Sequence, residues 1–129
     1  PDPCATTLDA LRRLRELPLG RSRDFDVFYL SLSSTLRSFI SGWFHEDATH
    51  KVTDEICSRL MSMGLLSREY GRRLLLLLEQ SDWVKFSTGR PTAEQARLDL
   101  AEAESFVRHV AEAACPEPMP RGRTVGGDP

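Results

Sequence analysis

Gly71–Phe86, GRRLLLLLEQSDWVKF, is the stretch that decides the fold. It contains five successive leucines, Leu74 to Leu78, which cannot all face one side of an α-helix because successive residues point in different directions around its axis. A helical segment that is apolar nearly all round must be covered on several sides. We therefore predict the central helix of an all-α bundle, closed by the aromatic pair Trp83 and Phe86.

The composition fits one soluble globular domain. The chain has 129 residues, of which 40% are hydrophobic and 28% are charged, with a net charge of −2. This length suffices for a hydrophobic core. The slightly acidic balance argues against nonspecific DNA or RNA binding, which needs a dense positive field to displace phosphate counterions. We therefore expect no nucleic-acid partner.

The three cysteines are too few for a disulfide framework. They are Cys4, Cys57 and Cys115. Sparse, odd-numbered cysteines are typical of reduced thiols in a cytoplasmic protein. A Cys4–Cys115 disulfide is the alternative if the two ends of the chain meet.

No segment of the chain approaches the roughly 20 apolar residues that a membrane span needs. The longest uncharged stretch in the middle of the chain, Val27 to Leu36, is short and rich in serine. No signal peptide is present. The chain begins with Pro1 and not with Met, so we expect a fragment of a longer protein whose missing parts carry further information.

Helical spacing and capping signals predict a compact bundle of about five helices over residues 6–114. The expected helices cover approximately residues 6–16, 24–44, 53–63, 67–86 and 92–114, between a lead at 1–5 and a disordered tail or linker at 115–129. The expected N-caps are one of the threonines Thr6 and Thr7, then Asp24, Thr53, Ser67 and Thr92. Gly64 is expected to end the third helix, and Gly71 to mark a close approach of a neighbouring helix.

Five arginines make residues 12–23 the basic end of the chain: Arg12, Arg13, Arg15, Arg21 and Arg23. Such a cluster can be a solvated helix face. It can also be a membrane-proximal basic segment, because arginine and lysine are enriched on the cytoplasmic side of membrane spans. The sequence leaves both interpretations open.

The motifs of common enzymes and cofactor sites are absent from the sequence. His45 and His50 are five residues apart, so on a helix their side chains point in different directions, and two ligands do not complete a tetrahedral metal site. A loop at Ser87–Thr92 precedes a helix N-terminus, where phosphate can bind. However, a capping box formed by Thr92 and Gln95 is expected to satisfy those donors. We predict no catalytic residue, metal or cofactor.

Asp82 to Phe86 has two interpretations. In the first, Trp83 and Phe86 fold under the bundle while Asp82 and Lys85 form an ion pair or face water. In the second, this corner docks a partner, since tryptophan frequently anchors protein interfaces.

The order of the helices resembles a known family. The residues that carry the likeness are Ala10-Leu11 with Leu14, then Phe28-Tyr29, Leu32-Ser33, Leu36-Arg37, Phe39-Ile40 and Trp43-Phe44, then Ala48, Val52–Ile56 and Leu77–Phe86, followed by a Pro-Thr-x-Glu-x-Ala helix start. This pattern, over roughly residues 8–112, resembles the soluble helical domain of BatD-like and related bacterial membrane proteins. These are encoded beside MoxR-type AAA+ ATPases and von Willebrand factor A-domain proteins.

The resemblance implies a setting and a role. A transmembrane helix would precede Pro1, and the domain would lie at the cytoplasmic face of the bacterial inner membrane. It would be a non-enzymatic interaction module for the ATPase or the A-domain protein. Asp82, Trp83, Lys85 and Phe86 belong to the structural signature of the resemblance, which supplies no catalytic residues. Two alternatives stay open: a hydrolytic or small-ligand-binding bundle that uses His45, His50 or the Ser87–Thr92 loop, and a self-associating structural domain.

Overall fold

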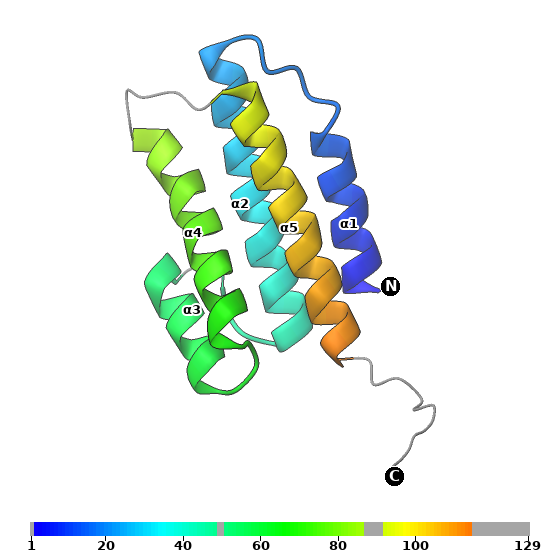
Figure 1. The fold of residues 1–129 in the computed structure, drawn as a ribbon, viewed down its shortest axis with the longest axis vertical. Helices are drawn as coiled ribbons and strands as arrows, with labels where there is room; N and C mark the ends of the chain where they lie inside the picture. Colours follow the sequence, from blue (N-terminus) through cyan, green and yellow to red (C-terminus); the bar gives the residue numbers. More distant parts are fainter. Residues whose placement is uncertain (1, 49–50, 87–91, 115–129) are drawn as a thin grey trace.

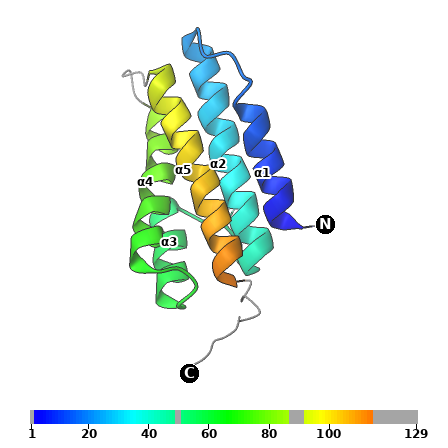
Figure 2. The ribbon, with the colours of Figure 1, turned by 45° about the vertical axis from the view of Figure 1, so that its right-hand side comes forward.

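Four long helices form an antiparallel bundle, and a fifth, shorter helix packs on its outside (Figures 1 and 2). The computed structural model describes residues 2–48, 51–86 and 92–114, without the side chains of residues 22, 83–86 and 114. The helices are α1 (Pro3–Leu14), α2 (Ser22–Phe44), α3 (Thr53–Ser62), α4 (Arg68–Phe86) and α5 (Ala93–Ala114). The all-α prediction is confirmed, and the predicted tail at 115–129 lies outside the described residues.

The helices α1, α2, α4 and α5 follow an up-down-up-down order, with each helix packed on the next and α5 closing the ring against α1. The helix α3 lies outside this ring and packs on α4. After α2 ends, the chain turns back along the bundle before α3 begins (Figure 1). This return brings the start of α3 beside the middle of α2 and not beside its end.

The second helix contributes more of the largest fully buried side chains than any other described helix. It has an apolar stripe with a spacing of three and four residues, which is buried at Phe25, Phe28, Tyr29, Leu32, Leu36, Phe39 and Ile40. Phe39 makes an edge contact with Phe106 of α5, with the ring centroids 6.3 Å apart. Burying such rings is worth about 1.5–3 kcal/mol each in hydrophobic transfer free energy. The aromatic residues of this stripe are therefore part of the core.

The leucine run on α4 is covered on three sides, by α2, α3 and α5. Leu74, Leu77 and Leu78 are buried, and Leu75 is half-buried. Leu76 was expected to be covered as well, but its side chain is 66% exposed. Since α3 and α5 flank α4 without enclosing it, one direction around the helix stays open to solvent.

Several predicted helix ends are confirmed. Ser67 caps α4 by accepting a hydrogen bond from the Tyr70 amide at 3.2 Å. Thr92 accepts from the Gln95 amide at 3.0 Å. Gly64 follows the last residues of α3 with φ at +74°, a conformation that favours glycine.

The first three N-caps were predicted wrongly. The helix α1 starts at Pro3, and Asp2 caps it by accepting from the Cys4 amide, so the predicted lead is helical from Pro3. Asp24 lies inside α2 and accepts from the amide of Arg21, the N-cap residue. A carboxylate at the third helical position reaches back to the N-cap amide as readily as a capping side chain reaches forward. Thr53 is the first residue of α3 and not its N-cap, which is Val52.

Gly71 is buried where α4 meets α3. A methyl group at this position would collide with the Cγ and Sδ atoms of Met61 on α3. The prediction that a neighbouring helix passes close to Gly71 is therefore confirmed. Glycine is used here for its small size, because φ is not positive at this position.

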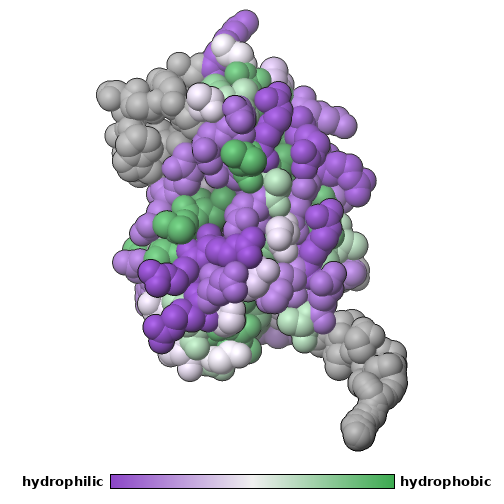
Figure 3. Space-filling view, in the orientation of Figure 1, coloured by the Kyte–Doolittle hydropathy of each residue, from purple (hydrophilic) through white to green (hydrophobic). Residues whose placement is uncertain are grey.

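Polar contacts fasten the ring of four helices at its surface. Arg15, which follows α1, donates to Glu104 of α5 at 2.5 Å. Arg73 of α4 makes two hydrogen bonds with the Glu102 carboxylate, at 2.5 and 2.8 Å, which hold the pKa of Glu102 below its ordinary value. The face shown in Figure 3 is mainly hydrophilic, with apolar surface in small separate patches.

Candidate functional site: a groove between α2, α3 and α4

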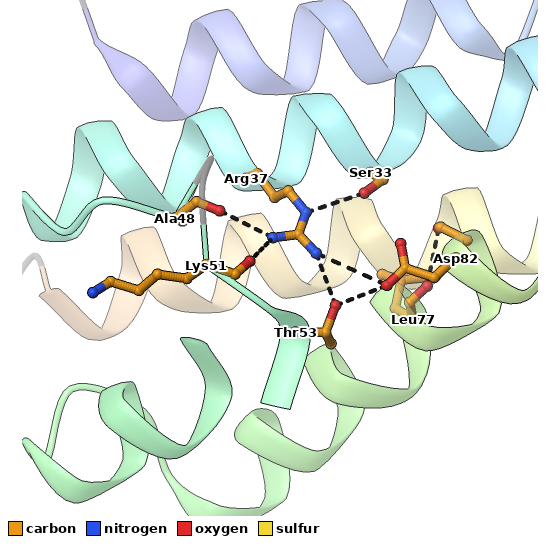
Figure 4. A network of polar contacts seen from close by, with 8 residues as sticks. Ser33, Arg37, Ala48, Lys51, Thr53, Leu77 and Asp82 are labelled. Atoms are coloured by element: carbon orange, nitrogen blue, oxygen red, sulfur yellow. Dashed lines mark hydrogen bonds and ion pairs between the residues drawn. The ribbon is translucent and has the colours of Figure 1, made fainter. Parts of the chain in front are cut away.

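The side chain of Arg37 joins α2 to the segment that leads into α3 (Figure 4). Its guanidinium donates to the backbone carbonyls of Ala48 at 3.0 Å and Lys51 at 2.8 Å, and to the hydroxyl of Ser33 at 3.3 Å. The Arg37 side chain is 15% exposed. An arginine can satisfy several acceptors at once because its five N–H groups form a rigid planar fork.

The network continues through Thr53 to α4. The Thr53 hydroxyl accepts from Arg37 at 2.8 Å and donates to the Asp82 carboxylate at 2.9 Å. The same carboxylate lies 3.9 Å from the Arg37 guanidinium. Three elements thus meet at one hydroxyl group. We call Arg37, Thr53 and Asp82, with the carbonyls of Ala48 and Lys51, the polar clasp.

The polar clasp forms the floor of a groove of about 710 Å³ between α2, α3 and α4. The groove exists because α2 and α3 make no backbone contact within the described part of the chain. We call it the clasp groove. Its lining residues are Leu30, Ser33, Ser34, Arg37, Lys51, Val52, Thr53, Asp54, Glu79 and Asp82.

Exposed apolar side chains line and adjoin the clasp groove. Leu30 of α2 is 55% exposed and Val52 is 68% exposed. Val27, one helical turn before Leu30, shares its exposed face. Leu76 lines an adjoining hollow, which shares the lining residues Glu79 and Asp82 with the clasp groove. Of the seven large apolar side chains that are exposed in the described residues, two therefore line this groove and a third lines the adjoining hollow.

The rim of the clasp groove carries acidic groups. Asp54 at the start of α3 and Glu79 of α4 are both exposed. The guanidinium of Arg37 is occupied by the clasp, and the Lys51 side chain extends away from it (Figure 4). The accessible surface thus combines apolar side chains with carboxylates.

The bonding within the clasp limits its chemistry. Since Arg37 already donates to four acceptors, it is a poor anion receptor. The Thr53 proton is directed to Asp82 and not to an imidazole, and Thr53 is buried. Among the residues the structure describes, no group of three or more His, Cys, Asp or Glu side chains could hold a metal ion. The arrangement is suited to holding α2, α3 and α4 in position.

Three of the five arginines predicted as a basic segment form ion pairs in the structure. Arg12 and Arg13 both pair with Asp9, at 3.5 and 2.6 Å, and Arg15 pairs with Glu104. Arg21 is the N-cap of α2, and Arg23 is exposed in the first turn of α2. These residues lie at the end of α1 that is away from Pro3 (Figure 1). A membrane-proximal role for them stays a prediction.

The predicted signature at the end of α4 is only partly described. Asp82 belongs to the polar clasp, so its role is a contact across three elements. Trp83, Lys85 and Phe86 lie on α4, but their side chains are outside the described part of the structure. The choice between a packed corner and a docking corner stays open for these three residues.

The described histidine and cysteine candidates donate or accept none of the hydrogen bonds of the polar clasp. His45 ends α2 in the left-handed conformation, with φ at +58°, and is exposed. His50 and the loop at 87–91 lie outside the described residues, as does Cys115. Cys4 is half-buried, and Cys57 is a buried free thiol whose pKa is raised to about 12, chiefly by desolvation.

Sequence reasoning missed the role of Arg37. Arg37 lies between Leu36 of the apolar stripe and Ser38. In the sequence it therefore resembles an ordinary exposed position of the helix. Its function depends on contacts with residues 11 to 45 positions further along the chain. The one local signal was Thr53, a capping residue type that the structure uses for a long-range contact instead.

Comparisons with protein-family models, with curated proteins and with solved structures find no match to this chain. No helix in the described residues combines the length and the apolar content that crossing a membrane requires.

Proposed function

We propose that the chain is a non-enzymatic protein-interaction domain and that the clasp groove receives a helical segment of its partner. The observation that carries this proposal is that exposed Leu30 and Val52 line one groove, with exposed Leu76 in the adjoining hollow. Apolar side chains that gather at one concave surface are typical of binding sites, whereas scattered ones need no explanation.

The chemistry of the groove indicates the kind of partner. An amphipathic helix can place its apolar side chains in a groove between helices. The exposed carboxylates of Asp54 and Glu79 favour lysine or arginine beside the apolar face of that helix. We therefore propose a basic amphipathic helix as the ligand.

The family resemblance suggests which proteins to test first. It points to a MoxR-type AAA+ ATPase or a von Willebrand factor A-domain protein as the partner, with the domain tethered at the cytoplasmic face of the bacterial inner membrane. This part of the proposal depends on the pattern of residues in the sequence. The groove proposal does not depend on it.

The experiment is coprecipitation and titration of the purified chain with each of these two proteins. Leu30→Ser should weaken the complex by about tenfold or more, the effect of losing an interface side chain worth about 1.4 kcal/mol. Leu98→Ser is the matched control, because Leu98 is 57% exposed on α5 and lines neither this groove nor its neighbouring hollow.

A complex that forms equally well with both variants would place the interface elsewhere on the bundle. Absence of binding by either protein at tens of micromolar would argue against the partners that the resemblance implies. In that case a basic amphipathic peptide still tests the groove directly. Light scattering of the free chain separates both outcomes from the alternative of self-association.

A further inference from the structure

A second groove lies at the end of the bundle where the chain leaves α5. Its volume is about 630 Å³. It is lined by Trp43, Phe44, His45, Gly64, Leu65, Leu66, Ser67, His109, Val110 and Ala113. We call it the end groove. Apolar surface is visible at this lower end of the bundle in Figure 3.

The walls of the end groove are mainly aromatic and aliphatic. Trp43 and Phe44 are half-buried at the end of α2, and Leu65 is 41% exposed in the connection between α3 and α4. Trp43 is held in place by Phe39, with their ring centroids 5.7 Å apart. His109 is stacked on Tyr70 at a centroid distance of 3.6 Å. No lining residue is a carboxylate, a lysine or an arginine.

The sequence that follows α5 matches this surface. Residues 115–120 read CPEPMP, with proline at every second position and one charged residue, Glu117. Proline fixes φ near the value of polyproline II and removes an N–H that would otherwise need a partner. Proline-rich segments bind to grooves lined by aromatic residues in several recognition domains.

The connectivity brings the segment to the groove. Ala113 lines the end groove, and residue 115 is only two positions further along the chain. Six residues of polyproline II span about 19 Å. Attachment so close to the site raises the effective concentration of the segment to the millimolar range, so even weak contacts lead to binding.

We propose that residues 115–120 of this chain bind in the end groove in an extended, polyproline-type conformation. Proline side chains and Met119 lie against Trp43, Phe44 and Leu65, and the segment forms an ordered start to the tail. This proposal is independent of the clasp groove, which shares no lining residue with the end groove and has an acidic rim.

The test is ¹⁵N relaxation of the full chain. The amides of Glu117 and Met119 should show heteronuclear NOE values close to those of α5, while Gly126 and Gly127 show the low values of a free chain end. Replacing Pro116, Pro118 and Pro120 together by serine should reduce the values at Glu117 and Met119 to those of the glycines. It should also shift the Trp43 indole resonance.

Leu65→Ser should release the segment in the same way, whereas Leu98→Ser, equally conservative and outside the groove, should leave it bound. Low NOE values at Glu117 and Met119 in the unaltered chain would overturn the proposal. So would NOE values that fall on dilution, which would show that the tail binds to a second copy. Binding of an added proline-rich peptide beside a mobile tail would overturn it as well, because the occupant would then be another protein.

Discussion

The guanidinium of Arg37 lies 3.9 Å from the carboxylate of Asp82, and the hydroxyl of Thr53 forms a hydrogen bond with each of them. Arg37 comes from α2, Thr53 from α3 and Asp82 from α4. Because α2 and α3 make no backbone contact in the described residues, these side chains link the two helices directly, beside the packing of each on α4. Single substitutions in the polar clasp can therefore change the width of the clasp groove.

Arg37→Met should lower the free energy of unfolding by about 2–4 kcal/mol, since it removes the donor to the carbonyls of Ala48 and Lys51 and the cation beside the Asp82 carboxylate. Urea denaturation measures the change. The stability of Arg37→Lys should lie between that of the unaltered chain and that of Arg37→Met, because an ammonium keeps the charge but cannot reach all four acceptors. Arg97→Met, at an exposed position of α5, is the control and should change stability by less than about 0.5 kcal/mol. Equal effects at positions 37 and 97 would show that the clasp contributes little.

Thr53→Val should lower the free energy of unfolding by about 1–3 kcal/mol, although the two side chains have nearly the same shape. The substitution removes the group that accepts from Arg37 and donates to Asp82. Thr53→Ser keeps the hydroxyl and should lose less. A larger loss of stability in Thr53→Ser than in Thr53→Val would show that the methyl group and not the hydroxyl is what matters at this buried position. Both variants are compared by urea denaturation at pH 7.

Gly71→Ala should destabilise the chain by about 1–2 kcal/mol, although alanine favours helix by about 1 kcal/mol, because the new methyl group meets Met61. A double-mutant cycle with Met61→Ala tests the cause. The double variant should be more stable than the sum of the two single changes implies, by about 1 kcal/mol or more. Strict additivity would mean that the two residues do not compete for space.

Stability should decrease as the pH rises above 9, in part through Cys57. Burial raises the pKa of this thiol from the ordinary 9.0 to about 12 in the folded state. Between these two values the folded chain binds more protons than the unfolded chain, so the stabilisation is complete below pH 9 and is lost as the pH rises towards 12. One such group contributes up to about 1.4 kcal/mol per pH unit. Denaturation between pH 8 and 10.5 should show a shallower loss in Cys57→Ala, and parallel curves would contradict the assignment.

The local part of this fold could be predicted from sequence, and the clasp groove could not. Ser67, Thr92 and Gly64 were assigned correctly because capping and left-handed glycine depend on residues within one helical turn. Thr53 was misassigned as a cap since the same residue type can make a long-range bond. Leu76 was expected to be covered because periodicity alone cannot say how many neighbours a helix has.

The position of α3 outside the ring of four helices has a consequence for its dynamics. It is anchored by Ile56, Cys57 and Leu60, by Met61 against α4, and by the polar clasp. An element with so few buried apolar contacts opens at a lower free energy than the whole domain. Amide hydrogens of α3 should therefore exchange with deuterium before those of α2 and α5. A ligand in the clasp groove that holds α3 against α2 would slow this exchange, so that α3 itself reports whether the groove is filled.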